Sequence, residues 1–219
     1  TDSMEREGAF GEFTGYMGAE QINHYFNLTC VTHRKKPIFN AFLSQFPPSE
    51  SSKLRGVSTE AVYTKLLKQD CNLPFVIEVA FPEHCGSQAM VVIRMERGHS
   101  GDAWRALMGA ASYTSGFGKI IVAVDDDIDP HDAESVNWAM SFRMQPHRDI
   151  LVVPGRTPGL DPSGRKPGLD ERQEDGNLSA LLINATMKWK FPPVSLPRKD
   201  FMENAKKIWE EAAPKVGVG

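Results

Sequence analysis

The chain has few of the features that mark membrane, nucleic-acid-binding or secreted proteins. No stretch approaches the roughly 20 apolar residues that a membrane-spanning helix requires. The net charge of −3 carries no signature of binding to nucleic acid or to a membrane surface. The three cysteines, Cys30, Cys71 and Cys85, are odd in number and lack metal-ligand spacing. We therefore expect reduced thiols, a cytoplasmic location, and partners that include neither nucleic acid nor a membrane.

Several common catalytic motifs are absent as well. The sequence contains no P-loop, no GxGxxG fingerprint and no serine nucleophile elbow. Its six histidines show neither HxxxH nor HExxH spacing. Chemistry that depends on these motifs is therefore not predicted. What is present is a composition of 41% hydrophobic and 24% charged residues, which is typical of a globular protein.

Apolar runs in the middle of the chain predict alternating strands and helices. Strands are expected at 75–81, 89–95, 119–124 and 149–154, and helices at 100–113 and 132–144. Ser58 and Thr59 are expected to cap an earlier helix, and Ser100 to cap the helix at 100–113. A strand–helix–strand order at this spacing predicts a right-handed crossover in a partly parallel sheet. The predicted fold class is therefore α/β with a mixed sheet.

The flanking segments have a different character. Residues 21–34 and the run "PIFNAFL" after them predict two strands of a β-rich region. We place a domain boundary near residue 56, with residues 1–56 as the tail of a β-barrel-like region and residues 57–219 as an α/β domain. Residues 155–178, rich in glycine, proline and charge, predict a long surface loop. Residues 200–215 predict a closing amphipathic helix.

The stretch "EREGAFGEFTGYM" at 5–17 places Glu7 and Glu12 among glycines and aromatic residues. One interpretation is a glycine-rich turn with two exposed acids. The other is a pair of carboxylates held in an apolar cleft, where burial and a second carboxylate raise the pKa. A glutamic acid that stays protonated near neutral pH can deliver a proton to a carbanion. The glycines would let the backbone pass close to a flat ligand.

The block "VDDDIDPHD" has four aspartates within positions 125–129. A metal cluster is one interpretation of this block. Aspartates that follow a buried strand often cap the next turn and helix instead. We therefore expect a structural role for them and predict no metal ligand in this chain.

Three blocks together resemble the C-terminal part of the UbiD family, the prenylated-flavin-dependent (de)carboxylases. "EGAFGEFTGYM" resembles the family's EGPFGE-TGY motif, with Ala9 where the family commonly has proline. "KIIVAVDDDIDPHDAESVNWAMSFRMQPHRD" is similar to its strand–DDDID–helix block, and "INATMKWKFP" to its late DAT-KW block. The blocks occur in the family's order, and the likeness covers almost the whole chain.

The resemblance implies a non-oxidative, reversible decarboxylase of aromatic, heteroaromatic or α,β-unsaturated acids. It implies prenylated FMN as the electron sink, and the end of a split β-barrel flavin-binding region before the α/β domain. The family's catalytic glutamates match Glu7 and Glu12, with Glu12 as the proton donor and Glu7 as the group that tunes its protonation. Gly8 and Gly11 would lie beside the cofactor.

The resemblance also implies what this chain does not carry. The family's catalytic arginine, and the ligands of the divalent metal and K⁺ that hold the flavin phosphate, lie upstream of the glutamate motif, and Arg6 is not that arginine. We therefore expect a C-terminal portion, or one half of a split enzyme, that is inactive alone. A flavin prenyltransferase would supply the cofactor, and the helix at 200–215 would pack on a neighbouring subunit in a homodimer or larger homo-oligomer.

The segment "SESSKLRG" at 49–56 resembles the family segment that lines the substrate pocket. Ser51 and Arg55 fall at lining positions, and by looser alignment Ile150 and Val152 line the same pocket. An arginine suits a second carboxylate on the small carboxylic acid substrate. The alternative is a surface arginine paired with a neighbouring glutamate, Glu50 or Glu60.

Two other classes of function stay open at this point. One is a non-catalytic assembly or dimerisation domain, because the flavin-holding part is not among these residues. The other is a flavin-binding module unrelated to decarboxylation.

Overall fold

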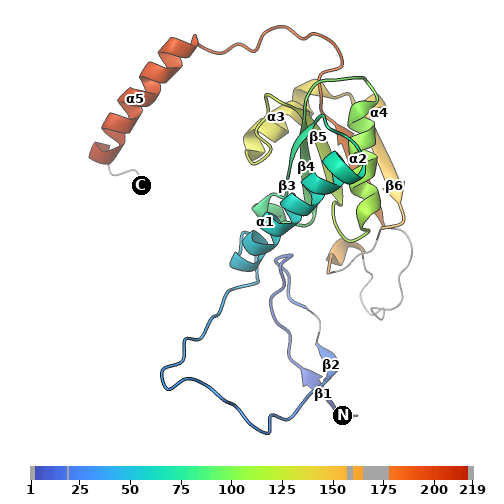
Figure 1. Cartoon of the computed structure of the whole chain (residues 1–219), viewed down its shortest axis with the longest axis vertical. Helices are drawn as coiled ribbons and strands as arrows, with labels where there is room; N and C mark the ends of the chain where they lie inside the picture. Colours follow the sequence, from blue (N-terminus) through green and yellow to red (C-terminus); the bar gives the residue numbers. More distant parts are fainter. Residues whose placement is uncertain (1–2, 19, 157–159, 165–177, 217–219) are drawn as a thin grey trace. The chain divides into compact units, whose positions relative to one another are not determined.

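The computed structural model describes residues 3–18, 20–156, 160–164 and 178–216. The chain divides into two compact units, Thr1–Lys188 and Trp189–Gly219. The first unit contains a two-stranded sheet near the N-terminus and a five-stranded sheet with helices on both faces (Figure 1). This arrangement confirms the predicted α/β fold class with a mixed sheet.

The large sheet has the strand order β3-β4-β5-β7-β6. Its strands are β3 (Val76–Ala80), β4 (Met90–Met95), β5 (Ile120–Asp125), β6 (Ile150–Pro154) and β7 (Ser179–Asn184). The three central strands, β4, β5 and β7, run parallel, and the edge strands β3 and β6 pair antiparallel with them. Four of the five strands lie where the apolar runs predict them, and the parallel pairing of β4 with β5 agrees with the predicted partly parallel sheet.

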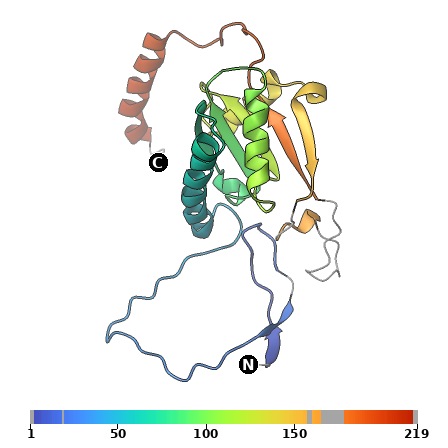
Figure 2. The ribbon, with the colours of Figure 1, turned by 45° about the vertical axis from the view of Figure 1, so that its right-hand side comes forward.

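Alternate residues of the central strands point to opposite faces of the sheet and build two cores. On one face, Ile93 and Ile121 pack with residues of α1 (Glu50–Lys65), of the π-helical turn η1 (Leu66–Asp70) and of α2 (Asp102–Tyr113). On the other face, Val92 and Val122 pack with α3 (Ala133–Arg143), which is followed by the short α4 (Pro146–Asp149). Figure 2 shows α1 and α2 side by side across the first face. Burial on both faces explains why the central strands are almost wholly apolar.

Helix α1 begins earlier than the sequence predicts. Its N-cap is Ser49, whose hydroxyl accepts a hydrogen bond from the Ser52 amide at 3.3 Å. The expected caps Ser58 and Thr59 lie inside the helix and donate to backbone oxygens of the preceding turn. The prediction was wrong because serines and Gly56 are weak helix formers, and their tertiary contacts override that propensity. The boundary predicted near residue 56 lies within this helix, and the division into domains stays a prediction.

This cap gives a direct stability test. Replacing Ser49 with alanine is expected to lower the free energy of unfolding by about 1 kcal/mol, because a helix amide loses its acceptor. Ser58→Ala is the matched control, since that hydroxyl caps no helix end, and we expect a change within about 0.5 kcal/mol. Urea unfolding followed by circular dichroism measures both. A larger loss for Ser58→Ala than for Ser49→Ala would contradict the observed start of α1.

Two further local predictions need correction. Ser100 does not cap α2: the N-cap is Gly101, and the Asp102 carboxylate accepts from the His99 amide at 2.9 Å. The expected pair of strands over 21–43 is only partly right. β2 (Gln21–His24) is a strand and pairs with β1 (Met4–Glu7), but residues 25–49 form no strand. A strand needs a paired neighbour, and none of the described residues provides one there.

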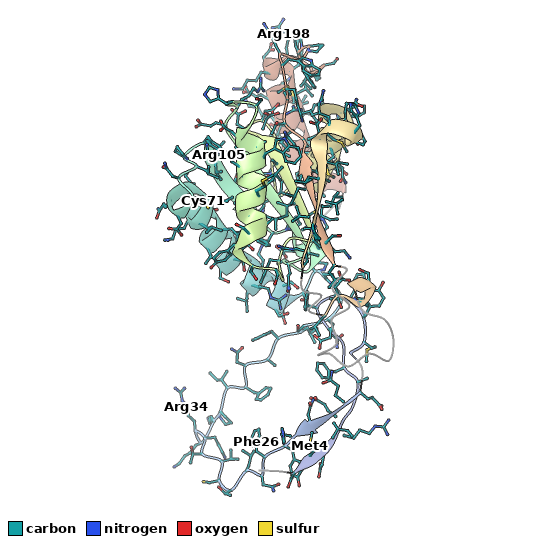
Figure 3. All side chains as sticks on the ribbon, turned by 90° about the vertical axis from the view of Figure 1, so that its right-hand side faces the viewer. Met4, Phe26, Arg34, Cys71, Arg105 and Arg198 are labelled. Atoms are coloured by element: carbon teal, nitrogen blue, oxygen red, sulfur yellow. The ribbon has the colours of Figure 1, made fainter. Side chains whose placement is uncertain are left out.

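The segment at 25–49 is rich in exposed apolar side chains. Phe26 is 78% exposed and Phe39 is 90% exposed. Phe26 and Arg34 project from this segment (Figure 3). Aromatic side chains are normally buried in cores or interfaces. The exposed aromatic side chains of this segment are therefore of the kind found at an interface.

The second unit consists of an irregular segment and α5 (Lys199–Val216), at the position where the sequence predicts a helix. Lys199 and Lys206 each approach a glutamate four residues later at 3.9 Å. Such pairs stabilise an isolated helix by a few tenths of a kcal/mol. None of the described helices is both long enough and apolar enough to cross a membrane.

Candidate functional site

The glycine-rich stretch forms a hairpin that carries both predicted catalytic glutamates. Strands β1 and β2 pair from Met4 to Glu7, and the ladder continues beyond them. The Gly18 amide donates to the Phe10 carbonyl at 2.8 Å, and Gly11 bridges to Met17.

The hairpin ends in a tight turn that begins at Glu12. The Glu12 amide donates to the Tyr16 carbonyl, and the Gly15 amide donates to the Glu12 carbonyl, each at 2.9 Å. Gly15 has a φ of +87°, a conformation that glycine adopts without the steric cost of a Cβ. The hydrogen bonds therefore fix the backbone of Glu12 in the turn.

The two glutamates have different surroundings. Glu7 is exposed in β1, and its carboxylate accepts a hydrogen bond from the Asn23 side chain. Glu12 is half-buried at the turn. The hairpin thus places both carboxylates on one glycine-rich element, with only Glu12 partly withdrawn from solvent.

The tip of the hairpin rests on the α/β part of the same unit. The ring of Phe13 lies under the Arg55 guanidinium, whose Cζ is 4.5 Å from the ring centroid. Phe13 also contacts Gly86. Gly86 follows the short turn η2 (Glu83–Cys85) and has a φ of +67°. A Cβ on Gly86 would lie 2.9 Å from the Phe13 ring. Close approach at this point therefore requires glycine.

A cavity of about 390 Å³ lies between the hairpin tip and the end of the sheet. The hairpin contributes Phe13, Thr14 and Tyr16 to its lining. The α/β part contributes His84, Cys85, Gly86, Gln88, Ala89, Ser115, Gly116, Lys119, Arg156, Asp161, Pro162, Ser163, Leu178 and Ser179, with Pro47 before α1. A cavity of this size is within the range of small-molecule sites.

Two cationic side chains, those of Lys119 and Arg156, line this cavity. Lys119 donates to Asp161 at 2.8 Å and to Ser163 at 2.6 Å. Arg156 donates to the Ala111 carbonyl at 2.5 Å and to the Phe117 carbonyl. Burial lowers the pKa of Arg156, so its charge is held in a partly desolvated position.

Of the four predicted substrate residues, the structure brings Arg55 into contact with the hairpin. Arg55 contacts Phe13 from α1, and its Nη1 donates to the Gly86 carbonyl at 3.3 Å and to Gln88 at 3.4 Å. Burial lowers the pKa of the Arg55 guanidinium, and the nearby Glu12 carboxylate opposes that shift. Ser51 lies one turn earlier on α1, where its amide donates to the Leu43 carbonyl at 3.2 Å.

The expected pairing of Arg55 with a surface glutamate does not occur. Glu50 accepts from the Leu43 amide at 2.7 Å, and Glu60 accepts from the Phe81 amide at 2.9 Å. Both carboxylates therefore accept hydrogen bonds from backbone amides.

Ile150 and Val152 lie elsewhere. Both belong to β6, the edge strand at the far side of the sheet from β3, against which α1 packs. Ile150 packs on the core beneath α3, and Val152 is 59% exposed. The structure does not bring these two residues together with Ser51 and Arg55, so their role in the pocket stays a prediction.

The two glycines expected beside a cofactor also differ. No atom lies within 4 Å of a Cβ built on Gly8, whereas a Cβ on Gly11 would lie 2.9 Å from the Gln45 side chain. The backbone at Gly8 is therefore open to a ligand, and Gly11 is used for packing within the chain.

The aspartate block after β5 joins the end of that strand to α3 through hydrogen bonds and ion pairs. Arg143 donates to Asp125 at 2.9 Å and to both carboxylate oxygens of Asp127 at 2.7 Å. Asp129 accepts from the His131 amide at 2.9 Å, and Asp132 is the N-cap of α3. These contacts are the turn and cap roles expected from the sequence, with a buried ion pair in addition.

Sequence reasoning missed the residues that join the hairpin to the α/β part. Phe13 stands beside Glu12 in "GEFTGYM", but only the fold places it between Arg55 and Gly86. Lys119 and Arg156 likewise reach one cavity from distant positions. The signal available was weak: a glycine after "EHC" and a lysine after "GFG", neither of which has a fixed spacing to the glutamates.

Comparisons with known proteins agree with the fold and the hairpin. The family model of the 3-octaprenyl-4-hydroxybenzoate carboxy-lyase C-terminal domain matches residues 52–185, and that of its Rift-related domain matches residues 1–46. An uncharacterized protein from Archaeoglobus fulgidus is 31% identical over 195 residues, which cover 86% of this chain and 37% of that protein.

Solved structures of the same class are also similar. The UbiD-class enzyme HmfF from Pelotomaculum thermopropionicum, in complex with FMN, gives a TM-score of 0.75 at 29% identity over 94% of this chain and 44% of that one. Vanillic acid decarboxylase from Sedimentibacter hydroxybenzoicus, in its open form, gives 0.73 at 25% identity over 96% of this chain and 45% of that one. The chain spans less than half the length of each of these relatives.

Proposed function

The chain belongs to the UbiD family of carboxy-lyases, and we propose that it supplies the proton-donating carboxylates and part of the substrate cavity of a flavin-dependent decarboxylase. The observation that carries the proposal is the glycine-rich hairpin. It presents Glu7 and Glu12 on one element, and its tip lies at the rim of a cavity lined by the α/β part.

In this reaction the bond between the substrate carbon and its carboxylate breaks, CO₂ leaves, and the electron pair stays on the carbon. Prenylated FMN, when bound, supplies the delocalised system that accepts this electron density. Glu12 then delivers a proton to the carbon that has lost CO₂. A general acid must stand within hydrogen-bond reach of the reacting atom. The support for this role is that Glu12 directly precedes Phe13, which lines the cavity. The proposed role of Glu7, on the same hairpin, is to tune the protonation of Glu12; its own carboxylate accepts a hydrogen bond from Asn23.

The residues present fit a flat cofactor on the exposed side of the hairpin. The backbone at Gly8 is open, and Glu7 beside it is exposed. Gly8 would therefore hold the cofactor ring at close range, and Gly11 would shape the hairpin by packing on Gln45. The divalent metal and K⁺ expected with the flavin phosphate would bind outside these residues.

The substrate we propose is a small aromatic, heteroaromatic or α,β-unsaturated carboxylic acid. Arg156 lines the cavity and supplies positive charge for an anionic ligand, whereas the charge of Lys119 is offset there by Asp161. The family's vanillic acid decarboxylase, similar in fold to this chain, supports an aromatic acid.

We also propose that the enzyme is a homo-oligomer that α5 helps to assemble. Phe201, Ile208 and Trp209 are each about 60% exposed on this helix. A helix with such exposed apolar residues gains stability by packing on another surface. The structurally similar HmfF has been solved in an evolved dimeric form.

Co-expression with a flavin prenyltransferase tests the proposed function. The complete enzyme, prepared with and without the prenyltransferase, is incubated with a panel of aromatic and unsaturated acids, and the products are identified by mass spectrometry. We expect loss of CO₂ from at least one acid, and only in the co-expressed sample. Flavin binding without turnover of any acid would favour a flavin-binding module, and neither binding nor turnover would favour an assembly domain.

A further inference from the structure

Arg55, Phe13 and Gly86 meet at the point where the glutamate hairpin touches the α/β part. The Arg55 guanidinium covers the Phe13 ring at 4.5 Å, and the same guanidinium donates to the Gly86 carbonyl at 3.3 Å. Gly86 leaves room for the ring, because a Cβ there would lie 2.9 Å from it. Each of the three residues therefore contacts the other two.

We propose that Arg55, Phe13 and Gly86 form a latch that holds the hairpin against the α/β part, and that Arg55 is a positioning residue for Glu12. The inference rests on the proposed function for its catalytic consequence, but the latch itself is a contact within this chain.

The position of Phe13 next to Glu12 in the chain explains how the latch would act. Phe13 follows Glu12 directly, and two backbone hydrogen bonds of 2.9 Å fix Glu12 in the turn. When the ring of Phe13 is held, the Glu12 backbone is held with it. A displacement of about 1 Å in a reacting group can reduce a rate by about 100-fold, so small movements of the hairpin matter.

The partly buried setting of Arg55 strengthens the contact. A guanidinium over an aromatic face is attracted more strongly when water is excluded. Gly15 in the same turn lies against Phe46, where a Cβ would come within 2.6 Å of the ring. The turn therefore has a second aromatic contact besides that of Phe13.

The latch and the substrate-contact hypothesis for Arg55 predict different kinetics. If Arg55 binds a second carboxylate of the substrate, its loss raises KM for that substrate and relaxes selectivity against the monoacid. If Arg55 acts through Phe13, its loss lowers kcat for every substrate, and removal of the aromatic ring has the same effect.

A double-mutant cycle in the flavin-loaded holoenzyme separates these roles. Arg55→Met and Phe13→Leu keep most of the side-chain volume and remove the cation and the ring. We expect each to lower kcat by about 5- to 30-fold, the change that matches one partly desolvated cation–π contact. We expect Arg55→Met, whose side chain does not line the cavity, to change KM less than about 2-fold, and the double variant to be no slower than the slower single variant. Multiplied effects of the two substitutions, or a loss confined to KM, would overturn the latch.

Arg105 supplies a matched control. Arg105 belongs to α2 and lies away from the hairpin (Figure 3). Its guanidinium is 5.8 Å from the centroid of the Phe75 ring. Arg105→Met removes an arginine–aromatic contact of the same kind, and we expect kcat to stay unchanged.

Amide hydrogen exchange tests the latch without relying on activity. We expect the amides of Glu12, Gly15 and Gly18 to exchange faster in Arg55→Met and in Phe13→Leu than in the wild type, and at wild-type rates in Arg105→Met. Unchanged exchange in the first two variants overturns the latch whatever the activity. A wild-type holoenzyme that releases no CO₂ overturns the proposed function instead, and the exchange comparison still decides the latch.

Discussion

Replacing Glu12 with glutamine is expected to lower kcat of the holoenzyme by about 10²- to 10⁴-fold, the usual contribution of a general acid. Glutamine keeps the shape of the side chain but has no acidic proton to give to the carbon that has lost CO₂. The hairpin should be preserved, because its backbone hydrogen bonds at Glu12 do not involve the carboxylate. Flavin content, measured by absorbance, is expected to match the wild type.

Glu20 offers a control on the same hairpin. Its carboxylate pairs with Arg6 near the base of the hairpin and is given no part in catalysis. Glu20→Gln is therefore expected to keep kcat near the wild-type value. If Glu12→Gln keeps its rate to within about threefold, far less than a general acid contributes, another group donates the proton.

Replacing Arg143 with methionine is expected to lower the free energy of unfolding by about 3–5 kcal/mol, the usual cost of removing one partner of a buried ion pair. Arg97, 3.6 Å from Asp125, is the partner that remains. The side chains of Arg143 and Asp125 are only 2% and 1% exposed. Asp125 also accepts from the Met187 amide at 2.8 Å, so it cannot turn outward without breaking that bond. Urea unfolding measures the loss. Arg105→Met removes the more exposed partner of an ion pair with the buried Asp102, and because the Arg105 side chain is 57% exposed we expect it to cost less than about 1 kcal/mol.

The loss of unfolding free energy in Arg143→Met is expected to depend on pH in one direction. Burial raises the pKa of Asp125 in the folded protein, and Arg143 opposes that rise. Without Arg143, the folded pKa should rise further above the unfolded value, so the folded state binds the proton more tightly than the unfolded state. The deficit of Arg143→Met should therefore shrink as the pH falls through the folded pKa. A deficit that grows toward acid pH would show that Asp125 is not the group whose partner was lost.

Much of the α/β part could be predicted because its signals are local. The runs "FVIEVAF", "AMVVIRM" and "KIIVAV" are apolar enough to fill both faces of a sheet, and they became β3, β4 and β5. The N-cap of α3 likewise follows from Asp132 and the next three residues. Strand β7 was not predicted, because its short apolar run follows a sequence rich in glycine and proline and pairs with strands that are distant in sequence. The surface loop predicted at 155–178 lies mostly outside the described residues.

The site depends on contacts that no local pattern encodes. The glutamates stand out in the sequence because glycines surround them, and the structure places both on one hairpin. The contact of Phe13 with Arg55 and Gly86 joins residues more than thirty positions apart, and it forms only when the chain is folded. Ile150 and Val152 lie on the edge strand β6, and their predicted place in the pocket stays a prediction.

Protonation by Glu12 of a substrate carbon that has lost CO₂ can be followed by the mass of the product formed in D₂O. The flavin-loaded enzyme and its Glu12→Gln variant are compared. We expect each wild-type turnover to release one CO₂ and to place one deuterium on the carbon that carried the carboxylate, while the variant accumulates almost no deuterated product. Equal rates of deuterated product from both proteins would show that Glu12 is not the proton donor.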